Sequence, residues 1–183
     1  MKHIYRILLK ICGWKINIPF REPSKSVICL APHTSNMDFV IGQLGLRASG
    51  RKTSFLMKKF WFFFPLKYIF TAIGGIAVDR TKHNSLTDRM VDMFNSNEKF
   101  HLAITPEGSR KAVEEWKTGF YYIALKASVP VELAYIDYKK KTVGILSVFI
   151  PTGNESADLA TIKSYYKNVC ARYPEKSKLV ISG

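Results

Sequence analysis

The sequence predicts a single α/β domain whose mixed, mostly parallel sheet is flanked by helices. Three observations lead to this prediction. Short apolar segments rich in strand-forming residues alternate with segments whose apolar residues recur at helical spacing, the pattern of α/β folds. The chain has 183 residues, 47% of them hydrophobic, which is enough for one sizeable core and too short for two ordinary domains. No internal repeat, low-complexity tract or linker interrupts the alternation.

The first element expected is a short basic amphipathic helix near the N-terminus. Its apolar residues recur at i, i+3, i+4 and i+7, and they are Ile4, Ile7, Leu8 and Ile11. Such a helix either lies on an anionic bilayer or packs on the core of the protein, because both arrangements require the same apolar face. We therefore separate an N-terminal amphipathic segment, residues 1–20, from a main domain, residues 21–183.

The main domain opens with a strand that leads into a helix. Ser26 to Ala31 is a short apolar run stopped by Pro32, and it predicts a buried strand. Apolar residues at helical spacing then predict a helix over 35–48, with Thr34, Ser35 or Asn36 as its N-cap.

The same patterns predict the remaining elements, with a solvated turn at Lys139 to Lys141 between two of the strands. Further strands are expected at 54–57, 75–78, 102–105, 131–136, 143–150 and 179–181, and further helices at 86–94, 120–127 and 159–170.

Charge and aromatic content narrow the class of partner. The net charge of +14 implies a polyanionic partner, which could be nucleic acid, an anionic membrane or a phosphate-bearing substrate. The aromatic run Phe60 to Phe64 is difficult to place on a water-facing surface and favours lipid over nucleic acid. Its alternative is a core helix, since aromatics of this density also fill cores.

Membrane contact is expected to be peripheral, and the compartment reducing. The most apolar stretch, Phe60 to Val78, is interrupted by Pro65, Lys67 and two glycines, so no spanning helix is expected. The N-terminal residues lack the uninterrupted apolar centre of a signal peptide. The cysteines are three, widely separated and without a C-x-x-C pair, which indicates free thiols and no structural zinc.

The first candidate for chemistry is the pair His33 and Asp38 at the predicted transition from strand to helix. Side chains at the carboxyl end of a strand project into the crevice of an open α/β sheet. There a carboxylate can accept the proton of one imidazole nitrogen and leave the other nitrogen free as a base. Asp38 could equally stabilise the helix N-terminus alone. Spacing does not decide, because His83 and Asp88, at what we expect to be a solvated helix start capped by Ser85, also stand five apart.

The second candidate is the segment Pro106 to Arg110, which also follows a predicted strand. Gly108 permits close backbone approach, Ser109 offers a hydroxyl, and Arg110 supplies a planar set of donors suited to phosphate. The alternative is a polar turn with a solvated Arg110. Arg80, at the end of another predicted strand, is either a further anion contact or the surface partner of Asp79.

Four blocks in order resemble those of the glycerolipid acyltransferases, and above all the 1-acylglycerol-3-phosphate (lysophosphatidate) acyltransferases. The blocks are His33 to Asp38, Gly75 to Arg80, Pro106 to Arg110 and Val129 to Val131. Lys58 also resembles a family position. The resemblance runs from about Val27 to Ile136.

The resemblance implies transfer of a fatty acyl group from acyl-CoA or acyl-ACP (acyl carrier protein) to the hydroxyl of a lysolipid. No covalent acyl-enzyme, metal or resident cofactor is implied. His33 would be the general base and Asp38 would orient it. The remaining site residues would bind substrate, with Pro130 helping to shape the acyl pocket; they are Arg80, Glu107, Gly108, Ser109, Arg110 and Lys58. The main domain would then be the acyltransferase domain, bound peripherally at the cytoplasmic face of an anionic membrane.

Other functions stay open at this stage. Thr105 and Glu132 depart from the family pattern, so a lyso-amino-acid lipid or another hydroxylated lipid is an alternative to 1-acylglycerol-3-phosphate. A basic protein that binds lipid or nucleic acid without catalysis is the alternative from another class, although no nucleic-acid partner is expected.

Overall fold

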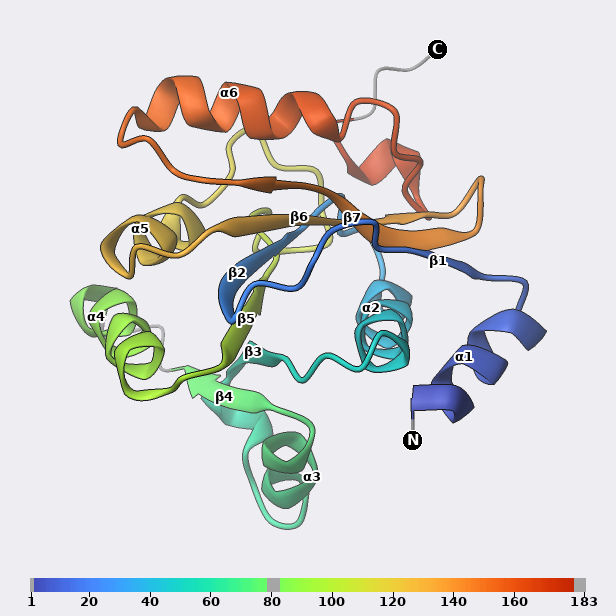
Figure 1. Cartoon of the computed structure of the whole chain (residues 1–183), viewed down its shortest axis with the longest axis horizontal. Coiled ribbons are helices and arrows are strands. Elements are labelled where there is room, and N and C mark those ends of the chain that lie inside the picture. Colours follow the sequence, from blue (N-terminus) through green and yellow to red (C-terminus); the bar gives the residue numbers. More distant parts are fainter. Residues whose placement is uncertain (1, 79–82, 180–183) are drawn as a thin grey trace.

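The computed structural model describes residues 2–78 and 83–179. Within them, one seven-stranded sheet of order β1-β7-β6-β2-β5-β3-β4 is flanked by helices (Figure 1). The strands are β1 (Lys15–Asn17), β2 (Lys25–Leu30), β3 (Ser54–Lys58), β4 (Gly75–Val78), β5 (Phe100–Ile104), β6 (Val131–Asp137) and β7 (Thr142–Phe149). The predicted fold class is confirmed.

Strand direction determines where functional side chains can gather. The strands β6, β2, β5, β3 and β4 are mutually parallel, so their carboxyl ends share one edge of the sheet. Strand β7 returns antiparallel to β6 after the turn at Lys139 to Lys141, and β1 pairs parallel with β7. The predicted turn between two strands is thereby confirmed.

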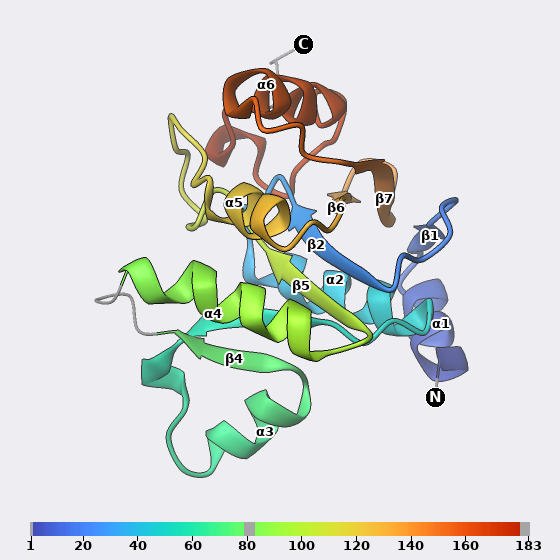
Figure 2. The same ribbon diagram turned by 60° about the vertical axis from the view of Figure 1, so that its left-hand side comes forward.

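Helices cover both faces of the sheet. They are α1 (Lys2–Ile11), α2 (Asn36–Ala48), α3 (Leu66–Ala72), α4 (His83–Ser96), α5 (Gly119–Lys126) and α6 (Glu155–Tyr165), with short 3-10 turns η1 (Lys59–Trp61) and η2 (Pro174–Lys176). Figures 1 and 2 show α4, α5 and α6 on one side of the sheet and α1 and α2 on the other. Successive side chains of β2 point to opposite faces of the sheet. Val27 and Cys29 pack in the core on the side of α4, α5 and α6, and Ile28 faces the side of α1 and α2.

Several predicted boundaries were wrong, and two elements, β1 and α3, were not predicted. Helix α6 begins four residues before the predicted start because the Asn154 side chain accepts a hydrogen bond from Ala157 N–H and caps it there. It also ends at Tyr165, five residues early. Helix α4 begins at His83 instead of after Ser85. The strand expected at 179–181 falls mostly outside the described residues, and Leu179 is a bend.

The amphipathic pattern of α1 is present, but its apolar face is exposed. Only Leu9 is buried, against Ile41 of α2, and Arg6 Nε donates to Ala48 O at 2.9 Å. The four residues of the predicted face are exposed, by as much as 77% at Ile11. Packing on the core therefore does not account for them. Among the described residues, no helix has the length and hydropathy needed to cross a bilayer.

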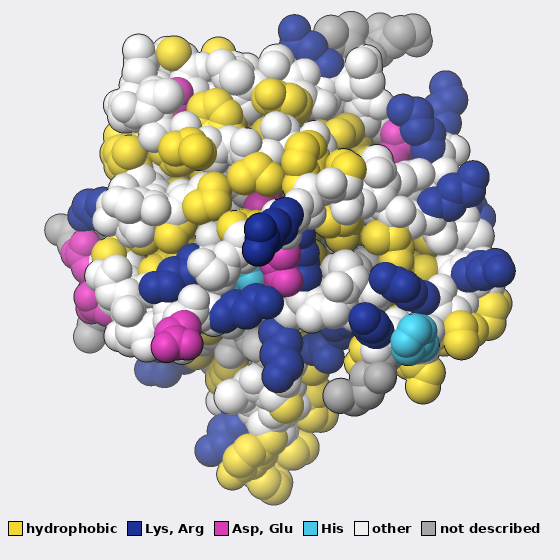
Figure 3. Space-filling model, viewed as in Figure 1, with side chains coloured by type: hydrophobic (Ala, Val, Ile, Leu, Met, Phe, Trp, Pro, Cys, Tyr) yellow, Lys and Arg dark blue, Asp and Glu magenta, His cyan; other side chains and the backbone are white. Residues whose placement is uncertain are grey.

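The aromatic run is likewise exposed and does not form a core helix. Only its first two residues, Phe60 and Trp61, lie in η1; the run ends before Pro65, after which α3 begins. The region from η1 to α3 projects from the β4 side of the sheet (Figures 1 and 2). Its exposed large side chains are Phe60, Trp61, Phe63, Phe64, Tyr68 and Ile69. Figure 3 shows hydrophobic side chains gathered at this lower end of the molecule.

Candidate active site

Loops from four parallel strands meet at the carboxyl edge of the sheet. His33 follows β2 by three residues, Glu107 follows β5 by three, Tyr138 comes directly after β6, and Lys58 ends β3. The register places these positions at the same edge, which is where α/β folds bind ligands.

The N-terminus of α2 brings Asp38 back toward His33. Ser35 is the N-cap, and its hydroxyl accepts from Met37 N–H at 3.1 Å. In return Asp38 Oδ2 accepts from the N–H groups of Ser35 at 2.9 Å and Thr34 at 2.8 Å, completing a capping box. The carboxylate therefore stabilises the start of the helix, which is one of the two roles predicted for Asp38.

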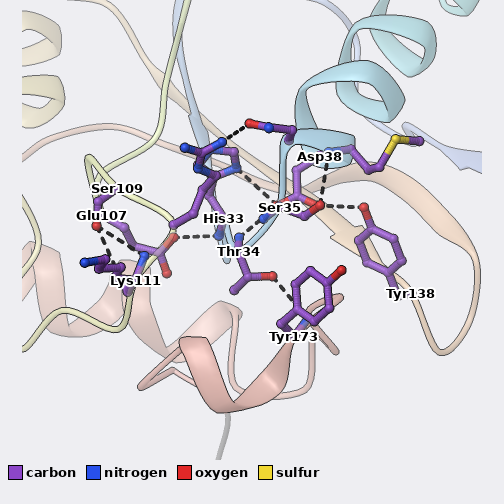
Figure 4. A network of polar contacts seen from close by, with 12 residues as sticks. His33, Thr34, Ser35, Asp38, Glu107, Ser109, Lys111, Tyr138 and Tyr173 are labelled. Carbon is purple, nitrogen blue, oxygen red and sulfur yellow. Dashed lines mark hydrogen bonds and ion pairs between the residues drawn. The ribbon is translucent and has the colours of Figure 1, made fainter.

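The same carboxylate also contacts the imidazole. His33 Nδ1 lies 3.1 Å from Asp38 Oδ2, and the Asp38 side chain is 1% exposed against 16% for His33 (Figure 4). When Nδ1 carries the ring proton and donates a hydrogen bond to Asp38, Nε2 is unprotonated and can accept a proton. Among the described residues, none hydrogen-bonds Nε2. Helix capping and histidine orientation are therefore combined in one side chain.

Asp38 is held ionised. Burial raises its pKa, but hydrogen bonds from His33, Tyr138 and Ser35 N–H outweigh burial and bring the pKa below its usual value. The carboxylate thus keeps its negative charge at neutral pH and can stabilise an imidazolium on His33.

Glu107 fixes the backbone of the histidine. Its Oε2 accepts from His33 N–H at 2.5 Å, and the side chain is nearly completely buried. Burial raises the pKa of Glu107 to about 7, although the hydrogen bond from His33 N–H opposes this. A carboxyl group that titrates near neutral pH therefore lies directly beneath the histidine.

The rest of the Pro106 to Arg110 segment lies beside the start of α2. Arg110 Nη1 donates to Asn36 Oδ1, on the first residue of that helix. Gly108 has a φ of +64°, and a Cβ there would meet the Lys117 side chain at 3.0 Å. Ser109 Oγ accepts from Lys111 N–H at 3.3 Å and is exposed. The guanidinium and the hydroxyl are thus accessible to a ligand.

Not every predicted site residue is brought to this edge. Lys58 is there and exposed, but Pro130 lies at the amino end of β6, where its carbonyl accepts from Val27 N–H at 3.0 Å. Pro130 and His33 therefore lie at opposite edges of the sheet. The contribution of Pro130 to an acyl pocket stays a prediction. Arg80 lies outside the described residues. Among the residues described, no three His, Cys, Asp or Glu side chains cluster as metal ligands.

Sequence reasoning missed Tyr138, whose hydroxyl donates to Asp38 Oδ1 at 2.7 Å. It also missed Tyr173, whose N–H donates to Thr34 Oγ1 at 3.2 Å. Tyr138 could have been found by the criterion that selected His33, since each lies two residues past the end of a predicted strand. Tyr173 had no comparable signal.

Comparison with known proteins gives the family. The model of the family described as Acyltransferase matches residues 15–135. The structure is similar to the crystal structure of the 1-acyl-sn-glycerophosphate (LPA) acyltransferase PlsC from Thermotoga maritima, with a TM-score of 0.62 at 16% identity over 92% of this chain and 74% of that one. A search of curated proteins gave no match. Because the family match covers well over half of the chain, the chain belongs to the Acyltransferase family, and the structural similarity shows that it shares the fold of the Thermotoga maritima enzyme.

Proposed function

We propose that this acyltransferase moves a fatty acyl group from acyl-CoA or acyl carrier protein to the hydroxyl of a lysolipid, with 1-acylglycerol-3-phosphate as the preferred acceptor. The observation that carries the proposal is the contact of His33 Nδ1 with a buried, ionised Asp38, which leaves Nε2 free. The similarity to the 1-acyl-sn-glycerophosphate acyltransferase from Thermotoga maritima supports the choice of acceptor.

The chemistry follows from that geometry. His33 Nε2 takes the proton of the acceptor hydroxyl as the oxygen attacks the thioester carbonyl, forming the new C–O bond. Asp38 stabilises the imidazolium through Nδ1–H. The C–S bond then breaks, and the proton on Nε2 passes to the departing thiolate. No acyl group is attached to the enzyme in this scheme.

Arg110 is suited to the phosphate of such an acceptor. Its contact on the protein is the neutral amide oxygen of Asn36, which positions the guanidinium without cancelling its charge. Arg80, Ser109, Gly108 and Lys58 complete the proposed acceptor site. In Figure 3, Lys and Arg side chains lie across the middle of the face shown, in keeping with an anionic ligand.

The departure at Glu132 does not favour another acceptor. Glu132 is fully buried near the amino end of β6, where it pairs with Arg51, and this is the edge of the sheet opposite to His33. It is therefore explained by packing and not by substrate choice.

The deciding experiment measures thiol release from acyl-CoA and from acyl carrier protein against a panel of lysolipids with and without phosphate. We expect release with 1-acylglycerol-3-phosphate, and its loss in His33→Ala. Arg110→Gln should raise KM for the phosphate-bearing acceptor more than for an uncharged one. No His33-dependent release with any pair would contradict the proposal.

We also propose peripheral binding to an anionic membrane at its cytoplasmic face. The exposed apolar residues of α1 and of the η1 to α3 region are accompanied by Lys58, Lys59 and Lys67, and basic groups each contribute on the order of 1 kcal/mol near an anionic leaflet. Replacing Trp61 and Phe63 with Ser should weaken sedimentation with vesicles containing phosphatidylglycerol. The matched change of Tyr165 and Tyr173, exposed tyrosines elsewhere, to Ser should leave sedimentation unaltered, and equal losses would refute this surface.

A further inference from the structure

A tyrosine that directly follows a distant strand completes the hydrogen bonding of the active-site carboxylate. Asp38 Oδ2 has three donors, namely His33 Nδ1 and the N–H groups of Thr34 and Ser35. Asp38 Oδ1 has one, the hydroxyl of Tyr138 at 2.7 Å (Figure 4). Because Asp38 is 1% exposed, water offers no ready substitute for that donor.

Tyr138 is itself held by two other segments. Its N–H donates to Cys170 O at 2.9 Å, and its ring meets Trp14 edge to face at 5.1 Å. The Arg172 guanidinium lies 6.0 Å from the ring centre. Burial, with the bond to Asp38, raises the pKa of Tyr138, so the hydroxyl stays protonated and remains a donor.

We propose that Tyr138 is a positioning residue that acts through Asp38 to set the orientation and basicity of His33. The hydroxyl fixes the rotation of the carboxylate by holding the oxygen that the helix cap does not use. It also takes up part of the negative charge that would otherwise act on the imidazole. The inference rests on the proposed role of His33 as the base.

The charged and titratable groups next to His33 and Tyr138 determine how a pH profile of activity is interpreted. Asp38 and the buried Glu107 face His33, and Asp38 and Arg172 face Tyr138. Tyr138→Phe changes none of these charges. A shift in the titration of His33 in this variant therefore reflects the lost hydrogen bond.

Tyr138→Phe should lower kcat about tenfold, the kinetic equivalent of losing one charge-assisted hydrogen bond, with less change in KM. The acidic limb of the kcat/KM profile should move to higher pH by about half a unit, because more of the Asp38 charge acts on the imidazolium. The matched control is Tyr135→Phe. It removes the hydroxyl of a buried tyrosine on β6, three residues before Tyr138, and that hydroxyl accepts a hydrogen bond from Asn17 Nδ2 at 3.2 Å. It should leave the profile unmoved.

A double-mutant cycle separates action through Asp38 from a general loss of structure. Adding Tyr138→Phe to Asp38→Asn should cause no further fall in kcat, since the acceptor of the hydrogen bond has already been altered. A further tenfold fall would overturn the inference.

A measurement that does not depend on catalysis tests the role of Tyr138 separately from the proposed function. The titration of the His33 ring, followed by NMR and assigned with His33→Ala, should shift in Tyr138→Phe and not in Tyr135→Phe. Identical titration in wild type and Tyr138→Phe overturns the role of Tyr138 whatever the activity. Absence of acyl transfer in the wild type, with the NMR shift present, overturns only the proposed function.

Discussion

Two clusters, each combining a histidine with two carboxylates, lie at opposite edges of the same sheet. At the carboxyl edge His33 contacts Asp38 through its ring and Glu107 through its N–H. At the amino edge His101, near the start of β5, lies between Glu132 and Glu22. The two clusters contain similar groups, yet only one is arranged for chemistry.

The amino-edge cluster has its groups directed at one another. Ser26 Oγ lies 2.8 Å from His101 Nδ1 and donates to Glu132 Oε1 at 2.5 Å, and Arg51 donates to the other oxygen of Glu132. His101 Nε2 faces Glu22 Oε1 at 3.2 Å without the alignment of a hydrogen bond. Both ring nitrogens therefore face protein groups.

Accessibility separates the two histidines. The His101 side chain is 1% exposed, and burial lowers its pKa although Glu132 and Glu22 oppose this. The His33 side chain is 16% exposed and has one nitrogen without a described partner. A buried histidine whose ring nitrogens both face protein groups serves packing, whereas one with a free, reachable nitrogen can act as a base.

The largest expected effect is on activity at the carboxyl edge. His33→Ala should reduce acyl transfer by about 10²- to 10⁴-fold, the usual contribution of a general base, while the thermal unfolding midpoint changes little. His101→Ala should instead lower the thermal unfolding midpoint, while the protein that remains folded keeps its pH profile of activity. Parallel assays and melting curves test the contrast, which fails if both variants lose activity at unchanged stability.

The next effect is on stability at the amino edge. Glu132→Gln should lower the free energy of unfolding by about 3 kcal/mol, because the nearly buried Arg51 loses the closer of its two carboxylate partners and keeps only Glu22, at 3.9 Å. Urea unfolding measures the change. The exposed pair Lys178 and Glu114 offers the control, since Glu114→Gln should have no measurable effect. Equal results for the two variants would mean that the buried pair contributes nothing.

The smallest effect is a pH dependence at the carboxyl edge. Burial raises the pKa of Glu107 from 4.5 to about 7, so the fold favours the protonated form. The associated stability is complete below the unfolded pKa and is lost as the pH rises through about 7. Glu107→Gln, which does not titrate, should therefore gain about 2.5 kcal/mol of unfolding free energy relative to wild type between pH 5 and pH 8. Urea unfolding at both pH values tests this, and a pH-independent difference would contradict it.

Local patterns were sufficient for much of the fold and for the contact between His33 and Asp38. Strand β2 and helix α2 follow from an apolar run, a proline and a capping serine within 25 residues of chain. His33 and Asp38 are five apart, so the capping box that begins α2 also brings them together. Helix α3 was missed because a seven-residue segment after a proline has too few turns to show a helical period.

The sequence alone therefore determined the α/β class, the acyltransferase family resemblance and the pairing of His33 with Asp38, because each depends on neighbours along the chain. Only the tertiary structure decided which groups surround that pair. Tyr138 reaches Asp38 across 100 positions, and Arg110 reaches Asn36 across 74. It also decided that the apolar face of α1 is exposed, since an apolar stripe has the same spacing whether it faces lipid or core. Contacts between distant segments depend on strand order and register, which periodicity does not encode.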